Sequence, residues 1–221
     1  MDVAIRPIIE DDLDMVARIE RQAFPTLCPP TPLKREMGNR RVRYLVAWEP
    51  LPLDDGETSS GEYRELGTDG SIGGLGKLMG AVKDRLGQRK VRVPTDYLVQ
   101  GFVGLWFVAD EAHITAIAVE EDSRRRGIGE LLIIGSIYLA MHLNSAVVSL
   151  EARVSNYPAR ALYHKYGFEH VGLRKAYYTD NREDAVIMTT QPIHSPDYQA
   201  RFMDLRRKFS DRYGEASIVV V

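Results

Sequence analysis

The first fifty residues contain segments with helix-like and segments with strand-like spacing of their hydrophobic positions. Val3–Pro7 and Arg43–Trp48 are rich in strand-forming residues, so each predicts a short strand. Pro25–Pro32 holds four prolines and cannot be helical, whereas Leu33–Met37 predicts a second short helix. Asp11–Phe24 predicts a longer helix, because its apolar residues recur on one face: Leu13, Val16, Ala17, Ile19 and Ala23.

From residue 97 onward, strand-like and helix-like segments follow one another without a long break. Tyr97–Phe107 and His113–Val119 predict two strands joined by a short turn. The further predicted elements are an apolar helix over Gly127–Leu143, a strand over Ala146–Ala152, a helix over Asn156–Tyr166, and strands over Phe168–Arg174 and Asp184–Thr190. Strands and helices that alternate in this way are typical of an α/β sheet with at least one parallel pair of strands.

The C-terminal segment has an amphipathic pattern. Large apolar and aromatic residues recur every three or four positions, as on one face of a helix: Tyr198, Phe202, Leu205, Phe209 and Tyr213. Such a helix must cover an apolar surface, which belongs either to its own sheet or to another subunit. A homodimer through this helix or through the tail Ile218–Val221 is therefore one of two alternatives.

The segment between residues 50 and 95 differs in composition from the rest of the chain. Leu51–Gly70 has six acidic residues and one arginine, a net charge of −5, and its Gly, Ser and Asp content predicts a solvated loop. Ser71–Val93 has six basic residues and one aspartate, a net charge of +5, and five glycines interrupt its helical spacing. Because loops this long are uncommon inside compact domains, we interpret the segment as an insertion. Either its two halves neutralise each other, or the basic half binds a membrane surface, ribosomal RNA or an acidic protein.

Length and charge narrow the class of protein. The 29 Lys and Arg nearly balance the 31 Asp and Glu, so no overall charge draws this chain to nucleic acid or to an anionic membrane. Cys28, the single cysteine, cannot form an internal disulfide. The first fifteen residues lack the apolar run of a signal peptide, and Ile128–Leu143 is too short to span a bilayer. We expect a cytoplasmic protein with one domain over residues 1–190, a charged insertion at about 50–95 and a helical extension over 191–221.

The most distinctive local motif is Arg124–Gly129, which reads RRRGIG and lies between a predicted strand and the apolar helix. Glycines at 127 and 129 allow backbone N–H groups to converge, and with the helix N-terminus these groups favour anionic oxygens such as those of phosphate. A dinucleotide-binding motif would need a third glycine where Leu132 stands, and the surroundings of Gly76 and Lys77 lack the spacing of a P-loop. The alternative is a basic loop that only opens a helix.

This motif resembles the pyrophosphate-binding sequence Arg/Gln-x-x-Gly-x-Gly/Ala of the GNAT N-acetyltransferases, matched here by Arg124, Gly127 and Gly129. Further along, the chain resembles the RimI-type ribosomal-protein-alanine N-acetyltransferases, a branch that acetylates the α-amino groups of protein N-termini. The resemblance covers residues 97–190 well and residues 3–48 loosely. Its segments are Leu150–Asn156, Ala161–Tyr163, Tyr166–Phe168, Gly172, Arg174, Tyr177–Tyr178 and Glu183–Ala185.

The resemblance implies a fold and a donor. The fold is the GNAT fold, a mixed and mostly antiparallel α/β sheet that helices flank and that opens at one point to admit acetyl-CoA. The α-amino group of a peptide or protein would attack acetyl-CoA directly within a ternary complex, because acetyl transfer from a thioester to an amine requires no separate nucleophile. Acetyl-CoA would be bound by the backbone of Ile117, Ala118 and Val119, by Arg124, Arg125, Arg126, Gly127, Ile128 and Gly129, and by Asn156.

Two residues match the family's catalytic positions. Glu151 is a carboxylate in an otherwise apolar strand and falls where the family has its general base; the alternative is an edge-strand residue that faces solvent or pairs with Arg153. Tyr163 falls where the family has a phenol that protonates the sulfur of coenzyme A; the alternative is simple packing. Asn156, which begins the same helix, is by its position also an N-cap.

The acceptor side is matched less closely. Tyr177 and Tyr178 would form a wall of the peptide site, with surface packing as the alternative. Glu20 and Phe24 fall where the family shapes its substrate groove, but the tryptophan that usually follows the nearby proline is absent. This departure leaves the peptide specificity undetermined.

Two other functions are compatible with the same sequence. The acceptor could be a small amine or a lysine side chain, because the groove and not the fold selects it. The chain could also be a non-catalytic module that binds acetyl-CoA and engages a partner through its insertion and C-terminal helix. We expect no metal site, because the five histidines show no ligand spacing with one another or with Cys28.

Overall fold

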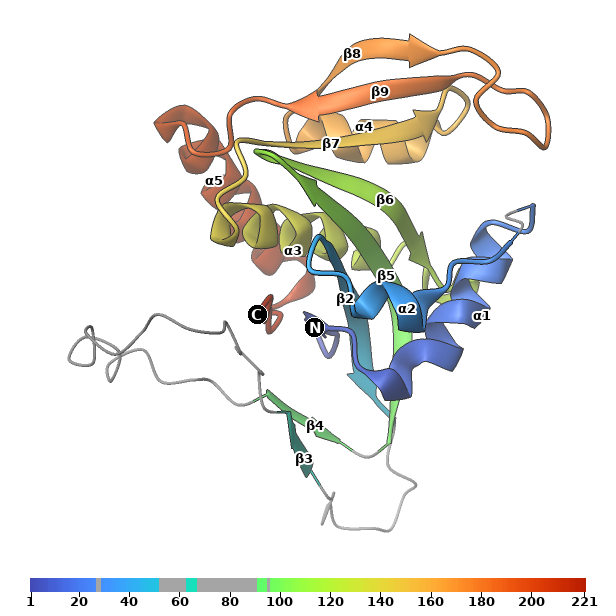
Figure 1. Cartoon of the computed structure of the whole chain (residues 1–221). Helices are drawn as coiled ribbons and strands as arrows, with labels where there is room; N and C mark the ends of the chain where they lie inside the picture. The colour runs from blue at the N-terminus through green and yellow to red at the C-terminus, as the bar shows by residue number, and fades with distance from the viewer. Residues whose placement is uncertain (27–28, 52–62, 67–90, 95) are drawn as a thin grey trace, which may run out of the picture.

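The computed structural model describes residues 1–26, 29–51, 63–66, 91–94 and 96–221. Its main sheet has seven strands: β1 (Ala4–Pro7), β2 (Val42–Pro50), β5 (Tyr97–Val108), β6 (Glu111–Val119), β7 (Val147–Arg153), β8 (Phe168–Arg174) and β9 (Ala185–Thr190). Their order is β1-β2-β5-β6-β7-β9-β8 (Figure 1). Neighbours are antiparallel except β6 and β7, which are parallel. The predicted mixed and mostly antiparallel sheet is therefore confirmed.

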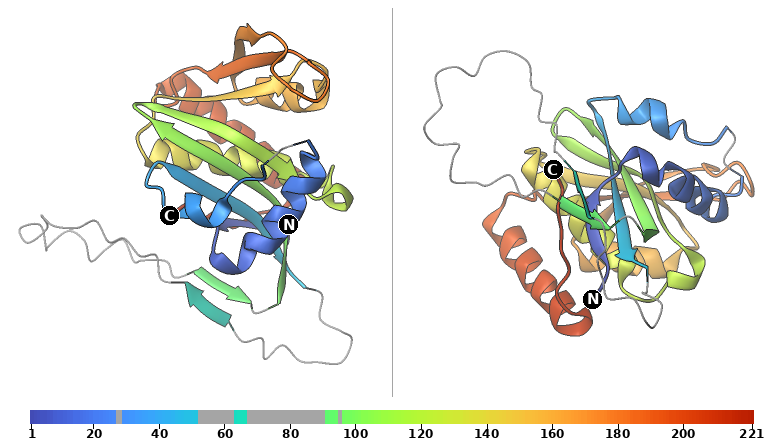
Figure 2. Two further views of the ribbon diagram at one scale, coloured as in Figure 1. Left: turned by 45° about the vertical axis from the view of Figure 1, so that its right-hand side comes forward. Right: turned by 90° about the horizontal axis from the view of Figure 1, so that it is seen from below.

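Helices cover both faces of this sheet (Figure 2). They are α1 (Leu13–Ala23), α2 (Leu33–Met37), α3 (Ile128–His142), α4 (Tyr157–Lys165) and α5 (Pro196–Tyr213). On one face, α1 and α2 pack through Val16, Ile19 and Leu33 on residues of β2 and β5. On the other face lie α3, α4 and α5.

The apolar helix α3 lies between the sheet and α5 (Figure 2). Ten of its fifteen residues are buried, and they are distributed around the helix rather than along one stripe. A helix that is apolar all round must be covered on more than one side. On the α5 side this cover includes Phe202, whose ring centroid lies 5.1 Å from that of Tyr138.

Strands β6 and β7 are paired only over their first four residues. Glu111–Ile114 pairs with Val147–Leu150, and beyond this point the two described strands separate (Figure 1). On its other side β6 stays paired with β5 as far as Val119. The segment 115–119 therefore has one backbone edge that is not paired with β7, and this edge faces the opening.

The C-terminal part of the chain packs on its own sheet. Tyr198, Phe202 and Phe209 of α5 belong to the main hydrophobic core. After the helix, Ile218 forms a parallel bridge with Ile5 of β1, and the N–H of Val219 donates to the carbonyl of Ile5 at 2.9 Å. Of the two alternatives for the amphipathic helix, the structure shows the intramolecular one, and a homodimer stays a prediction.

Two short strands lie within the segment that the sequence predicts to be an insertion. β3 (Tyr63–Leu66) pairs with β4 (Val91–Pro94) as an antiparallel two-stranded sheet. The prediction of a loop is therefore wrong for residues 63–66, where four residues are too few to show a strand period above the acidic background. Most of the −5 and +5 halves, with the predicted helical spacing, lies outside the described residues, as does Cys28.

Candidate active site

Glu151 stands where the opening between β6 and β7 begins. It follows Leu150, the last residue of β7 that is paired with β6. Leu150 and Ala152 belong to the core beneath α3 and α4. Because side chains alternate along a strand, Glu151 projects from the opposite face, the one that carries α1 and α2.

The carboxylate of Glu151 is buried and lies within hydrogen-bond distance of a histidine ring and an arginine guanidinium. Its side chain is 8% exposed. Oε2 lies 3.0 Å from Nε2 of His113, and Oε1 lies 2.9 Å from Nε of Arg174. The alternative reading of an edge-strand residue paired with Arg153 is wrong, because β7 is an inner strand and Arg153 has other partners.

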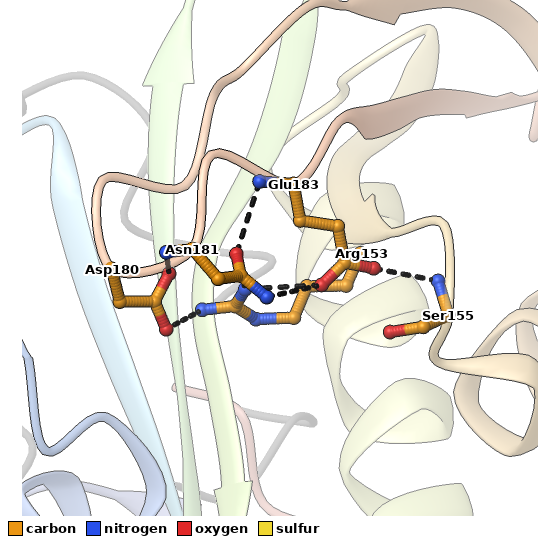
Figure 3. A network of polar contacts seen from close by, with 5 residues as sticks. All are labelled: Arg153, Ser155, Asp180, Asn181 and Glu183. Carbon is orange, nitrogen blue, oxygen red and sulfur yellow. Dashed lines mark hydrogen bonds and ion pairs between the residues drawn. The ribbon is translucent and has the colours of Figure 1, made fainter.

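Arg153 instead organises the loop between β8 and β9 (Figure 3). Its guanidinium lies 2.7 Å from Asp180 and 3.1 Å from Glu183, and it also donates to Asn181. Hydrogen bonds from Ser155, with smaller contributions from Asn181 and Arg153, lower the pKa of Glu183 to about 2. These contacts tie the loop to the end of β7, next to Glu151.

The same loop carries Tyr177 and Tyr178. Their rings meet edge to face with centroids 5.2 Å apart, and the guanidinium of Arg153 lies 3.8 Å from the centroid of Tyr178. Burial raises the pKa of Tyr178 to about 12; Arg153 acts in the opposite direction, and the nearby Glu151 raises it further. Tyr177 is 45% exposed. Both tyrosines therefore lie near Glu151, and Tyr177 is accessible to a ligand.

Tyr163 lies on α4, on the other face of the sheet from Glu151. It is 6% exposed, and its ring packs 5.8 Å from that of Phe168. Burial raises its pKa to about 12, and the nearby Tyr178 contributes in the same direction. Glu151 and Tyr163 both influence Tyr178 although they project from opposite faces of the sheet. That the two form one catalytic site stays a prediction.

The loop before α3 contains two residues in the left-handed region of the backbone. Gly127 caps the helix with φ of 84° and Arg125 has φ of 64°, both in the left-handed region. Alternation of this kind turns successive N–H groups to one side. All three arginines have exposed side chains, but Arg124 lies 3.9 Å from Glu121 and Arg126 lies 2.6 Å from Glu49. Only two of the three predicted arginines therefore have guanidinium groups that are not engaged by Glu49.

The end of α5 lies against this loop. A Cβ atom on Gly127 would come within 3.0 Å of the ring of Tyr213. The C-terminal extension, which the sequence places outside the family resemblance, therefore contacts the predicted phosphate-binding residues. Nothing in the sequence pattern indicates this contact, because it depends on how α5 crosses α3.

The remaining predicted donor-binding residues line the opening or its rim. The backbone of Ile117, Ala118 and Val119 pairs with β5 on one side and faces the opening on the other. Asn156 caps α4, since its Oδ1 accepts from the N–H of Ala159 at 3.3 Å. The predicted N-cap is confirmed, and binding of the donor stays a prediction.

The predicted acceptor residues on α1 have structural contacts. Glu20 is 2% exposed, and its carboxylate accepts from the N–H of Thr31 at 3.2 Å. Phe24 is partly buried and packs against the core under α1. Glu20 therefore fixes the chain that follows α1, while this helix covers the face from which Glu151 projects.

Three polar residues next to Glu151 were missed by sequence analysis. His113, Ser149 and Glu111 are joined by hydrogen bonds, and His113 reaches Glu151. The only sequence signal is the alternation along two separate strands, which places His113 on one face of its strand and Ser149 on one face of the other. Which strands pair, and in which register, could not be predicted from that alternation.

A concave region lies away from the predicted site residues. It is lined by residues of α3, α5 and the C-terminal tail, among them Tyr138, Met141, Arg206 and Ile218. None of the predicted site residues lines it. We therefore assign no part of the reaction to this groove.

Comparison with known proteins identifies the domain. The model of the acetyltransferase (GNAT) family matches residues 81–168. The structure of the ribosomal-protein-S18-alanine N-acetyltransferase from Escherichia coli aligns with a TM-score of 0.56 and 25% identity over 87% of this chain and 95% of that one. The chain carries a GNAT acetyltransferase domain. Arabidopsis thaliana NAA60 in complex with acetyl-CoA shares the fold, with a TM-score of 0.59 and 17% identity over 85% of this chain and 97% of that one.

Curated relatives of this GNAT domain are N-terminal acetyltransferases. A putative ribosomal protein bS18-alanine N-acetyltransferase of Bacillus subtilis is 44% identical over 96 residues, which are 43% of this chain and 64% of that protein. The Escherichia coli bS18-alanine N-acetyltransferase is 43% identical over 83 residues, 37% of this chain and 56% of that protein. The N-alpha-acetyltransferase of Saccharolobus solfataricus is 44% identical over 79 residues, which are 35% of this chain and 47% of that protein. The chain thus spans less than two thirds of the length of each of these relatives.

In the part of the chain that the structure describes, no helix combines the length and the apolar character needed to cross a membrane. Within the same part of the chain, no three His, Cys, Asp or Glu side chains are grouped so as to hold a metal ion. A cytoplasmic location stays a prediction from the sequence.

Proposed function

We propose that this GNAT domain transfers an acetyl group from acetyl-CoA to the α-amino group of a protein N-terminus, as a ribosomal-protein-alanine type of N-acetyltransferase. The printed activities of the bacterial and archaeal relatives support this choice of acceptor. The observation that carries the proposal is Glu151, a buried carboxylate at the start of the opening between β6 and β7.

The loop and strand residues fit acetyl-CoA as donor. Exposed Arg124 and Arg125 and the left-handed backbone at Gly127 suit the phosphates. The unpaired edge of Ile117–Val119 suits the amide groups of the pantetheine arm, which could pair with it as an added strand would. When bound, acetyl-CoA supplies an activated thioester, and the chain itself needs no nucleophile.

Two side chains handle the protons of the reaction. An α-amino group has an ordinary pKa of about 8, so it arrives largely as ammonium near neutral pH. Glu151 accepts a proton from this ammonium, directly or through a water molecule, and the freed amine attacks the thioester. Tyr163 donates its phenolic proton to the departing sulfur, and the second proton that the nitrogen loses as the amide forms restores the phenol. The raised pKa of Tyr163 keeps the phenol protonated at neutral pH, as an acid requires.

The acceptor would lie on the face of Glu151, between α1 and the loop of Tyr177 and Tyr178. Tyr177 offers an exposed ring, and Arg153 holds Tyr178 in place. Phe24 on α1 lies on the same face and adds apolar surface opposite that loop. An extended peptide would enter between these aromatic rings with its amino group toward Glu151.

The test is a panel of amines assayed with acetyl-CoA and read by mass spectrometry. The panel contains a peptide with the N-terminal sequence of ribosomal protein bS18, the same peptide with a blocked N-terminus, a lysine-containing peptide with a blocked N-terminus, and a polyamine. We expect acetylation of the free α-amino group alone. Transfer confined to the polyamine or to lysine would move the acceptor to another class, and absence of transfer in the presence of bound acetyl-CoA would indicate a non-catalytic module.

A further inference from the structure

A row of polar side chains connects Glu151 to the surface. Glu111, His113 and Ser149 lie on the same face of the sheet as Glu151, because His113 and Ser149 are directly opposite in the register of β6 and β7. Their exposure changes in steps: the side chain of Glu151 is 8% exposed, that of His113 26% and that of Glu111 46%. Ser149 is buried at 3%.

The hydrogen bonds in this row have a fixed direction. Ser149 has one hydroxyl proton, which it donates to the carboxylate of Glu111. The Oγ of Ser149 must then accept at its 2.8 Å contact with His113, so Nδ1 of His113 carries a proton. Nε2 of the same ring faces Oε2 of Glu151 at 3.0 Å. In this tautomer Nε2 has a free lone pair, so it can accept a proton once Glu151 has taken one up.

The proposed reaction needs an exit for one proton in each turnover. An ammonium that becomes an amide loses two protons, and the sulfur of coenzyme A takes up one. The other reaches Glu151, whose carboxylate is buried and has one oxygen against Arg174. A bound acceptor would also cover the open side of Glu151. A route through the protein is therefore useful.

We propose that Glu111, Ser149 and His113 form a proton relay that clears Glu151 after each acetyl transfer. This proposal rests on the proposed function. A proton on Glu151 passes to Nε2 of His113, Nδ1 gives its proton to Ser149, and Ser149 gives its hydroxyl proton to Glu111. Glu111 releases it to water. Each O–H or N–H bond that breaks is matched by one that forms, and no electrons are exchanged.

The proposal assigns these three residues a positioning and proton-transfer role without contact to the acceptor. We expect Ser149→Ala and Glu111→Gln each to lower kcat about tenfold, which is less than the roughly hundredfold or more that a direct acid–base group contributes. The KM for acetyl-CoA should change less than twofold, because none of the three lies in the loop at Arg124–Gly129. Glu169→Gln, an exposed carboxylate on β8, is the matched control.

Chemical rescue separates a relay from a packing role. His113→Ala should lose kcat and regain most of it when imidazole is added, with product followed by mass spectrometry of the peptide. Imidazole should not restore Glu151→Gln. A loss in His113→Ala that imidazole leaves unchanged, together with wild-type kcat in Glu111→Gln, overturns the relay. Glu111 is half exposed, so its variant keeps the test open if His113→Ala does not fold.

One measurement is independent of activity. With ¹⁵N-labelled histidine, the Nδ1–H of His113 should give an exchange-protected ring signal in the wild type that is lost in Ser149→Ala, while His142→Gln, at the end of α3, leaves it in place. Absence of that signal overturns the relay even if acetylation is observed. If the wild type shows the signal but acetylates no amine, the proposed function fails and the hydrogen-bonded row stands.

Discussion

Ile114 and Leu150 are the last paired residues of β6 and β7, and Glu151 is the next residue along β7. The separation of the strands therefore begins at the residue that we propose as the general base. This arrangement places a buried carboxylate at the point where β6 stops pairing with β7.

Glu151→Gln should lower kcat by about a hundredfold or more, because loss of a general base removes one of the larger contributions to such a reaction. Glutamine keeps the shape and can still accept from Arg174, so the Kd for acetyl-CoA should stay within about threefold. Steady-state kinetics and calorimetric titration of acetyl-CoA measure the two quantities. A kcat within a factor of three of the wild type would remove Glu151 from the mechanism.

Tyr163→Phe should lower kcat at neutral pH without changing the acidic limb of the pH–rate profile. Burial raises the pKa of Tyr163 to about 12, so the phenol does not titrate in an assay from pH 6 to 9. The folded state holds this proton more tightly than the unfolded state, whose tyrosine pKa is about 10. The stabilisation is present below pH 10 and is lost as the pH rises toward 12. Comparing thermal unfolding of wild type and Tyr163→Phe at pH 8 and pH 11 tests this.

The loop between β8 and β9 should loosen in acid. The pKa of Glu183 is lowered to about 2 by its hydrogen bonds from Ser155, and then by Asn181 and Arg153. Its contribution is therefore present above the ordinary value near 4.5 and is lost as the pH falls toward 2. Hydrogen exchange of residues 175–184 should quicken over this interval in the wild type, and already at neutral pH in Glu183→Gln. Asp197→Asn, in the first turn of α5, serves as a control.

Arg126→Ala should impair acetyl-CoA binding less than Arg125→Ala. Both side chains are exposed, but the guanidinium of Arg126 is engaged by Glu49 at 2.6 Å, whereas Arg125 is itself in the left-handed region with φ of 64°. We expect the Kd to rise about tenfold for Arg125→Ala and about twofold for Arg126→Ala, since one charge-assisted contact to phosphate is worth roughly 1.5 kcal/mol. Equal losses in the two variants would contradict this assignment.

Gly127→Ala should destabilise the fold by about 1–2 kcal/mol, because the residue has φ of 84° and alanine is strained there. The midpoint of thermal unfolding should fall by about 2–8 °C. Part of the loss comes from the Tyr213 ring, 3.0 Å from the new Cβ. The double variant Gly127→Ala/Tyr213→Ala should not simply add the two single effects, and strict additivity would show that the ring accommodates the methyl group without cost.

The sequence predicts the long elements well because each has a clear period or composition. Leu33–Met37 was predicted with the bounds that α2 has, and the apolar run of α3 was placed to within one residue at each end. The sequence pattern predicts a strand that begins at His113, whereas β6 begins at Glu111. That difference of two residues hid Glu111, which a turn assignment left out of the site.

Contacts between distant residues could not be predicted in the same way. The pairing of His113 with Glu151 depends on the parallel register of β6 and β7, and one residue of slip would turn one of them to the other face. The engagement of Arg126 by Glu49 joins residues 77 positions apart. Composition indicates that such charges exist, but only the packed sheet decides which of them meet.

The bridge between Ile218 and Ile5 makes the two borders of the sheet unlike each other. Residues near the C-terminus cover β1. Their backbone forms hydrogen bonds with the N–H and C=O of Ile5, which another strand could otherwise pair with. A chain truncated after Tyr213 would expose this border and gain a tendency to associate edge to edge. A fusion partner appended after Val221 would extend from the β1 side, with β2, β5 and β6 between it and the opening.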